Sequence, residues 1–113
     1  MSNHSALEGI RVLELTEGFS GAMAAKQFAD YGAEVVMIEG HDGHPLRKMG
    51  PFPDNQEDVN FSGSFIYTST NKRSITLNVF DKNDFDKLFS LLDTIDIFIT
   101  DFSYSSINTR IIE

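Results

Sequence analysis

Two short segments of the chain combine residue types that could hold an anionic ligand. The first is EGFSG at residues 17–21, where Gly18 and Gly21 separate an apolar run from a run of helix formers. Glycines at such a turn let a ligand approach the free N–H groups at a helix N-terminus, which favour anions. The spacing differs from the Gly-x-Gly-x-x-Gly dinucleotide motif, and one glycine is missing. On spacing alone, a tight strand-to-helix turn without a ligand is the simpler interpretation.

The second segment is NKRS at residues 71–74, which places two adjacent cations directly before an apolar alternation. The ammonium of Lys72 and the guanidinium of Arg73 could contact phosphate oxygens, the guanidinium in a bidentate manner. Solvated loop charges in an otherwise acidic protein explain this segment equally well when it is taken by itself.

Two histidines raise the question of a metal site. His41 and His44 flank Asp42 in a glycine-rich segment, and two imidazoles with a carboxylate could bind zinc. Metal sites need rigidly held ligands, and no predicted helix or strand fixes these three. We therefore expect a solvated loop and no metal. The chain has no cysteine, which excludes thiolate ligands, disulfides and a cysteine nucleophile.

The elements that must position these residues alternate between strands and helices. Apolar runs predict strands at residues 10–15, 34–39, 74–79 and 96–100, and helical spacing predicts helices over residues 22–31 and after an N-cap at Asp81. Helical crossovers make strands parallel, so we expect an α/β domain with an open, mostly parallel sheet and helices on its faces. Ligands of such sheets bind at the carboxyl ends of the strands, here residues 16–21, 39–41 and 100–103.

A long polar connection rich in glycine and proline, residues 40–70, interrupts this alternation. Loops of that length inside a compact domain are usually functional or mobile. Its apolar residues Phe61, Phe65, Ile66 and Tyr67 are expected to pack back onto the domain as a helical turn.

Length, charge and the N-terminus bound the class of protein. A chain of 113 residues corresponds to one domain, residues 1–113. Its formal net charge of −8 argues against binding nucleic acid or an anionic membrane. Residues 1–7 lack the apolar segment of a signal peptide, and no run reaches the length of a membrane span. We expect a soluble, cytoplasmic protein.

In combination, the segments resemble the start of family III CoA-transferases, the group of formyl-CoA and carnitine CoA-transferases and methylacyl-CoA racemases. The most specific match is ADYGAEVV at residues 29–36, followed later by NKRS. Further matching segments are LEGIRVLELT at residues 7–16, LRKMGP at residues 46–51 and DTIDIFI at residues 93–99. Order and spacing hold from about Leu7 to Phe102.

The resemblance implies a Rossmann-like domain that binds coenzyme A or an acyl-CoA as a substrate. By position, Gly18, Phe19 and Gly21 would lie near the thioester or pantetheine. The segment with Asn71, Lys72 and Arg73 would supply the phosphate contact, through Lys72. Asp101 and Phe102 would line the nucleotide. The implied partners are a CoA thioester and either a second copy of the chain or the remainder of a longer CoA-transferase.

Two departures from the family pattern weaken the expected affinity for CoA. The family usually has Arg, which packs on the adenine, where this chain has Gly40. It usually has Asn where this chain has Asp101, and a carboxylate there would repel a phosphate. The Asp that carries the acyl group in the family would lie beyond Glu113. We therefore expect a domain that is not catalytically complete alone. The alternatives are a non-catalytic interaction or dimerisation module with the same fold, and an unrelated small α/β binding protein.

Overall fold

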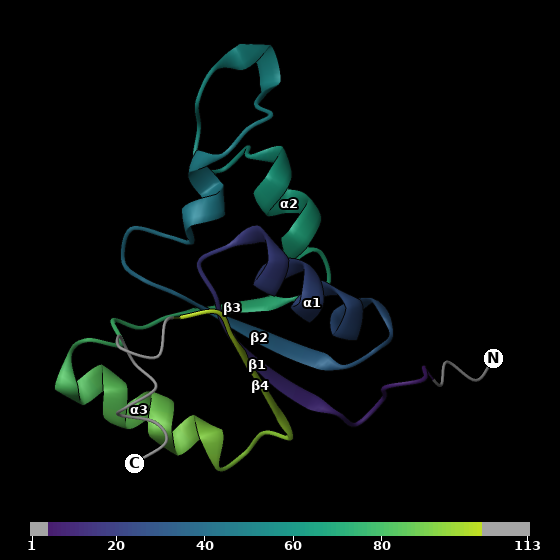
Figure 1. Cartoon of the computed structure of the whole chain (residues 1–113), viewed down its shortest axis with the longest axis vertical. Coiled ribbons are helices and arrows are strands. Elements are labelled where there is room, and N and C mark those ends of the chain that lie inside the picture. The colour runs from purple at the N-terminus through teal and green to yellow at the C-terminus, as the bar shows by residue number, and fades with distance from the viewer. Residues whose placement is uncertain (1–4, 103–113) are drawn as a thin grey trace.

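The computed structural model describes residues 5–102, which form a four-stranded parallel sheet with strand order β3-β2-β1-β4. The elements in chain order are β1 (Arg11–Leu15), α1 (Phe19–Asp30), β2 (Glu34–Glu39), the 3-10 turns η1 (Pro45–Lys48) and η2 (Pro53–Asn55), α2 (Gly63–Ser69), β3 (Arg73–Thr76), α3 (Lys82–Leu92) and β4 (Ile97–Thr100). The prediction of an α/β fold with a parallel sheet is confirmed (Figure 1).

Each face of the sheet buries its own apolar cluster, because successive residues of a strand point to opposite faces. Leu13 and Leu15 pack with Leu88 of α3. Val12 packs on the other face with the alanines of α1, Ala25 and Ala29. Helices α1 and α3 therefore cover opposite faces of the sheet, and the small side chains of α1 let it lie close to the strands.

The largest differences from the expected boundaries are at the start of α1 and the end of β3. Helix α1 begins at Phe19, three residues before the expected start, because Gly18 already acts as its N-cap. Strand β3 ends at Thr76, although Leu77 and Val79 still point into the core. The N-cap at Asp81 is confirmed: its side chain accepts a hydrogen bond of 3.2 Å from the backbone N–H of Asp84.

Residues 45–69, which we call the arm, project away from the sheet beyond α1 (Figure 1). The expected helical turn exists as α2, but the apolar residues expected to pack back are mostly exposed. Phe61, Ile66 and Tyr67 are 52–57% exposed, whereas the polar Ser62 and Thr68 are buried. Ser62 is buried because it links the two ends of the arm: its hydroxyl lies within hydrogen-bonding distance of the carbonyls of Leu46 and Met49, and it caps α2.

None of the helices within residues 5–102 has the length and apolar character needed to cross a membrane.

Candidate functional site

The carboxyl ends of β1, β2 and β3 surround a pocket of about 350 Å³. Its floor is apolar, and its rim carries acidic and imidazole side chains. The lining residues are Leu15, Thr16, Glu17, Ile38, Glu39, Gly40, His41, Asp42, Gly43, His44, Pro45, Leu77, Asn78, Val79, Phe80 and Phe102. None of these is Lys or Arg. The pocket lies where the sheet topology predicts a ligand, but the residues that line it offer no positive charge to a phosphate.

The turn after β1 is contacted by the carboxylate of Asp101, the residue that follows β4. Asp101 accepts hydrogen bonds of 2.8 Å from the backbone N–H of Glu17 and of 2.8 Å from that of Gly18. These N–H groups begin α1, where the helix dipole favours negative charge. In this structure the carboxylate on the turn is the chain's own Asp101, and binding of a ligand anion there stays a prediction.

Lys72 points into the interior and pairs with Glu14 of β1. The Lys72 ammonium lies 2.7 Å from Glu14 Oε1, and both side chains are only 1% exposed. It also donates a hydrogen bond of 2.9 Å to the carbonyl of Ala22 in α1. Burial lowers the pKa of Lys72, and the contact with Glu14 opposes that shift. Glu14 Oε1 has no directed hydrogen bond, so the charge of Lys72 is what compensates it.

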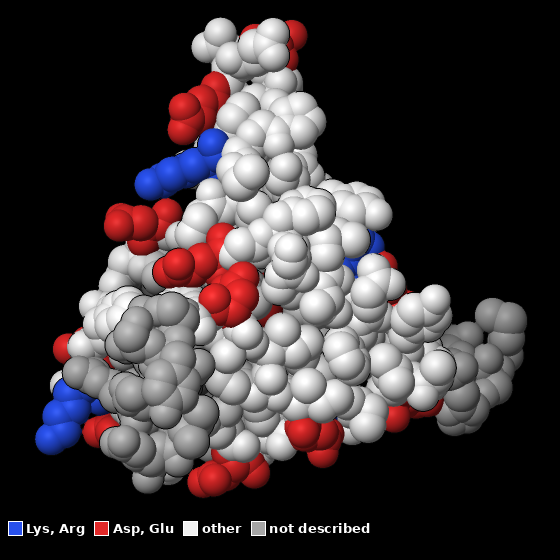
Figure 2. All heavy atoms as spheres, in the orientation of Figure 1, with Lys and Arg blue, Asp and Glu red and all other residues white. Residues whose placement is uncertain are grey.

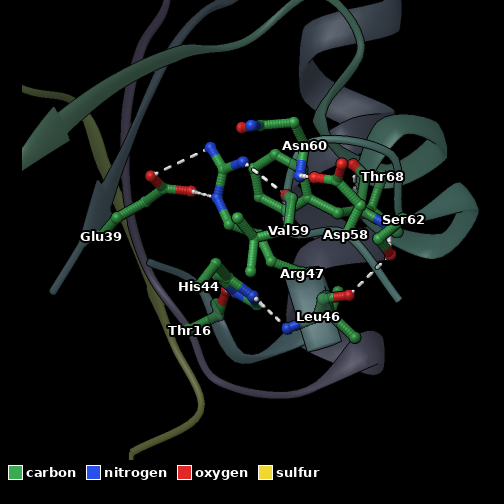
Figure 3. A network of polar contacts seen from close by, with 11 residues as sticks. Thr16, Glu39, His44, Leu46, Arg47, Asp58, Val59, Asn60, Ser62 and Thr68 are labelled. Carbon is green, nitrogen blue, oxygen red and sulfur yellow. Dashed lines mark hydrogen bonds and ion pairs between the residues drawn. The ribbon is translucent and has the colours of Figure 1, made fainter. Parts of the chain in front are cut away.

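A chain of hydrogen bonds connects this ion pair to the edge of the pocket. The hydroxyl of Thr16 donates to Glu14 Oε2 at 2.6 Å, and Thr16 Oγ1 lies 3.0 Å from His44 Nε2. His44 Nδ1 accepts a hydrogen bond of 3.1 Å from the backbone N–H of Leu46 (Figure 3). Since Nδ1 is an acceptor, the ring proton sits on Nε2 and is donated to Thr16. His44 is thus held neutral, with both nitrogens engaged.

The neutral state of His44 predicts how stability depends on pH. Burial lowers the pKa of His44 below its usual 6.5, so the unfolded chain binds a proton more readily than the folded one. The free energy of unfolding should therefore be constant above the unfolded pKa and fall as the pH drops below it, toward the folded pKa. We expect urea denaturation at about pH 7.5 and about pH 5.5 to show this loss of stability.

Two glutamine variants separate the contribution of His44 to this loss of stability from that of His41. His44→Gln should reduce the difference between the two pH values, whereas His41→Gln, at an exposed position, should leave it unchanged. An undiminished difference in His44→Gln would contradict the assigned neutral state.

Arg47 connects the arm to the end of β2 through its side-chain contacts. Its guanidinium makes two hydrogen bonds to the carboxylate of Glu39, of 3.0 and 3.2 Å. It donates a third, of 3.0 Å, to the carbonyl of Val59 (Figure 3). The guanidinium also stacks 3.9 Å from the ring centre of Phe65. Gly43 leaves room for this side chain, because a Cβ there would lie 2.7 Å from Arg47 Cδ. The guanidinium of Arg47, whose side chain is 22% exposed, is thus engaged by other residues of the chain, although Glu39 belongs to the pocket.

The remaining charges leave the visible surface predominantly acidic. Figure 2 shows many more acidic than basic side chains on the face that it presents. Lys26 pairs with Asp30, and Arg11 and Arg73 both lie near Glu34. Within residues 5–102 no cluster of three or more His, Cys, Asp or Glu side chains is arranged to bind a metal.

Comparison with known proteins identifies the family. A model of CoA-transferase family III matches residues 7–110. The chain belongs to CoA-transferase family III. The succinyl-CoA:mesaconate CoA-transferase of Haloarcula marismortui is 32% identical over 97 residues, which cover 86% of this chain and 24% of the relative. The (R)-2-hydroxy-4-methylpentanoate CoA-transferase of Clostridioides difficile is 34% identical over 94 residues, which cover 83% and 24%.

Solved structures agree with the fold. A CAIB/BAIF family protein from Brucella suis superposes with a TM-score of 0.81 at 23% identity, over 95% of this chain and 28% of that one. The chain spans about a quarter of the length of the two CoA-transferases described above.

The structure brings together some of the residues predicted for the CoA site. Gly18, Gly21 and Asp101 meet at the start of α1, and Phe102 lines the pocket. Phe19 is 47% exposed at the first position of α1. Their assignment to the thioester and nucleotide stays a prediction.

The NKRS segment lies elsewhere. Asn71 donates a hydrogen bond to Asp30 at the end of α1. Arg73 is the first residue of β3 and lies 3.7 Å from Glu34 at the amino end of β2, with its side chain 79% exposed. The segment precedes a parallel strand, so it approaches the opposite edge of the sheet from the pocket. The assignment of Lys72 to CoA phosphates also stays a prediction. In this structure the Lys72 side chain points inward and pairs with Glu14.

Sequence reasoning missed the network around His44. The expected solvated loop is wrong for His44, which is 3% exposed and bonded to Thr16 and Leu46. One signal was present in the sequence: Glu14 interrupts the otherwise apolar end of the first strand. A charge at a buried strand position requires a partner, and the structure shows that this partner is Lys72.

Proposed function

We propose that this chain supplies the CoA-thioester-binding part of a CoA-transferase, with the pocket at the carboxyl edge of the sheet holding a portion of the CoA molecule. The observation that carries the proposal is the place of the pocket, at the ends of three parallel strands in a family III chain. Both relatives described above are named as CoA-transferases.

The chemistry of the pocket limits which part of CoA it fits. Leu15, Ile38, Leu77 and Val79 form an apolar floor that suits a neutral, partly apolar group such as the adenine base or the pantetheine chain. Phosphates need donors and positive charge, which the lining residues lack. The phosphates should therefore project away from this pocket, and affinity of this chain for free CoA should be weak.

No residue within the described part is assigned as the acyl-carrying nucleophile. Two carboxylates at or beside the pocket are already engaged: Glu39 binds Arg47, and Asp101 binds the start of α1. We assign no covalent role to Glu17 and Asp42, which also line the pocket. Glu14 is buried against Lys72. We propose binding, and no complete transfer reaction, for this chain alone.

Gly40 offers a gain-of-affinity test of this proposal. A Cβ at Gly40 would meet no atom within 4 Å, so the start of a side chain is not obstructed there. Gly40→Arg adds a guanidinium at the rim of a pocket that lacks one, and we expect it to tighten CoA binding roughly fivefold in isothermal titration calorimetry. Ser90→Arg, which adds the same charge on the exposed side of α3, serves as the control and should change nothing. Equal affinity of Gly40→Arg and the unmodified chain, or no binding by either, would count against the proposal.

A second function, that of an interaction module, is favoured by the surface of the arm. Five large apolar side chains of the arm are 44–57% exposed: Met49, Val59, Phe61, Ile66 and Tyr67. Large exposed apolar patches mark contact sites with other protein surfaces. Sedimentation velocity tests this reading: concentration-dependent association that Ile66→Ser abolishes supports it, and a monomer at all concentrations contradicts it.

A further inference from the structure

Helix α1 has no N-terminal cap of its own. Its N-cap residue is Gly18, which has no side chain, and its first turn contains no acidic residue. Helices usually satisfy their first N–H groups with a side chain close in sequence. Here the carboxylate of Asp101, 83 residues after Gly18, takes that place with two hydrogen bonds of 2.8 Å.

Asp101 fits against the helix end because two glycines leave room for it. A Cβ on Gly18 would lie 3.1 Å from Asp101 Oδ2, and a Cβ on Gly21 would lie 2.8 Å from the same atom. The carboxylate therefore lies directly on the backbone of the turn. No second anion can approach the N–H groups of Glu17 and Gly18 while it stays there.

The helix end borders the candidate pocket. Glu17, whose N–H binds Asp101, and Phe102, the next residue after Asp101, both line the pocket. A ligand seated in the pocket would thus bring any charged group at this side close to the Asp101 carboxylate. A negatively charged ligand group there would be repelled by the Asp101 carboxylate, and the repulsion is stronger where less solvent lies between the two charges.

We propose that Asp101 determines ligand specificity by excluding an anionic group, a phosphate or a carboxylate, from the N-terminal end of α1. This inference rests on the proposed function of the pocket, because it assigns a selectivity to the same site. Asp101 occupies the anion position itself and adds a negative charge beside a pocket that lacks Lys and Arg.

The test compares anion binding by the full 113-residue chain and two variants. Asp101→Asn removes the charge and leaves one N–H without its acceptor, and Asp101→Ala also clears the space. The probes are coenzyme A, pantetheine, which has no phosphate, pyrophosphate and succinate. Calorimetry should show roughly tenfold tighter binding of CoA and pyrophosphate if the excluded group is a phosphate, and of succinate if it is a carboxylate. Pantetheine binding should not change.

Asp93→Asn removes the same charge at the far end of α3 and is the matched control, expected to bind every probe as the unmodified chain does. A purely structural cap would lower the urea midpoint of both Asp101 variants without raising affinity for any anion, and this result overturns the inference. Failure of all proteins to bind CoA and pantetheine would reject the proposed function instead, while pyrophosphate and succinate still decide the role of Asp101.

A measurement on the unmodified chain keeps the inference testable should both variants fail to fold. In amide NMR spectra, the Gly18 N–H signal should stay unshifted with pyrophosphate or succinate at concentrations on the order of millimolar, because Asp101 already occupies it. A saturable shift of the Gly18 signal with either anion would show that Asp101 excludes nothing.

Discussion

Replacing Lys72 by Met is expected to lower the free energy of unfolding by about 3–5 kcal/mol, the usual cost of removing one partner from a buried ion pair. Lys72 and Glu14 are each 1% exposed, and the ammonium compensates the Glu14 carboxylate across 2.7 Å. Met keeps most of the length and apolar volume of the lysine stem. The loss should therefore come from the uncompensated charge on Glu14 and from the lost hydrogen bond to the Ala22 carbonyl. Urea denaturation at neutral pH measures it.

Two further variants test the cause of that loss. Adding Glu14→Gln to Lys72→Met removes the uncompensated charge while keeping an acceptor for Thr16, and should recover about half of the lost stability. Lys87→Met, at an exposed lysine, should stay within about 0.5 kcal/mol of the unmodified chain. If Lys72→Met were as stable as Lys87→Met, the buried ion pair between Lys72 and Glu14 would be disproved.

Gly21→Ala should destabilise the protein by about 2 kcal/mol, against the usual trend for a helix position. Glycine inside a helix normally costs up to about 1 kcal/mol relative to alanine, so propensity alone predicts a gain. At Gly21 a Cβ would lie 2.7 Å from Thr16 Cγ2 and 2.8 Å from Asp101 Oδ2. Neither neighbour can easily yield, because Thr16 is hydrogen-bonded to Glu14 and Asp101 to the backbone of the turn.

The matched substitution is Gly40→Ala, where the added methyl meets nothing within 4 Å. Its urea midpoint should stay the same or rise slightly, since alanine restricts the unfolded chain. If Gly21→Ala were as stable as Gly40→Ala, the close fit of Asp101 against α1 would be disproved.

Much of the sheet could be predicted from the sequence because its signals are local. Apolar runs mark the strands, and Gly32 between α1 and β2 has the positive φ of 100° that favours glycine at a helix end. The β1-α1-β2 unit could be predicted from these apolar runs and from the glycine that separates α1 from β2. The arm could not be predicted in the same way, because its structure depends on long-range polar contacts. Ser62 joins Leu46 and Met49, and Arg47 joins Glu39 to Val59.

The location of the candidate site could be predicted from the sequence, but the contacts among its side chains could not. Parallel topology puts the turn at residues 17–21 near the residue after β4, and the structure confirms that Asp101 meets Gly18 there. The sequence could not show that the cations are used internally. Lys72 reaches Glu14 and Arg47 reaches Glu39 only after the strands are assembled, so composition alone overstates the positive charge available to a ligand.

The location of bound CoA tests the central claim most directly, namely that ligand binds at the carboxyl edge of the sheet. Titration of the isotopically labelled chain with CoA, followed by amide NMR to concentrations on the order of millimolar, reports every backbone N–H that senses the ligand. We predict saturable shifts at pocket residues such as Gly40, Asn78 and Phe80, and none at Ile66 on the arm. Saturable shifts confined to the arm or to the amino edge near Arg73, or no shifts at all, would contradict the account.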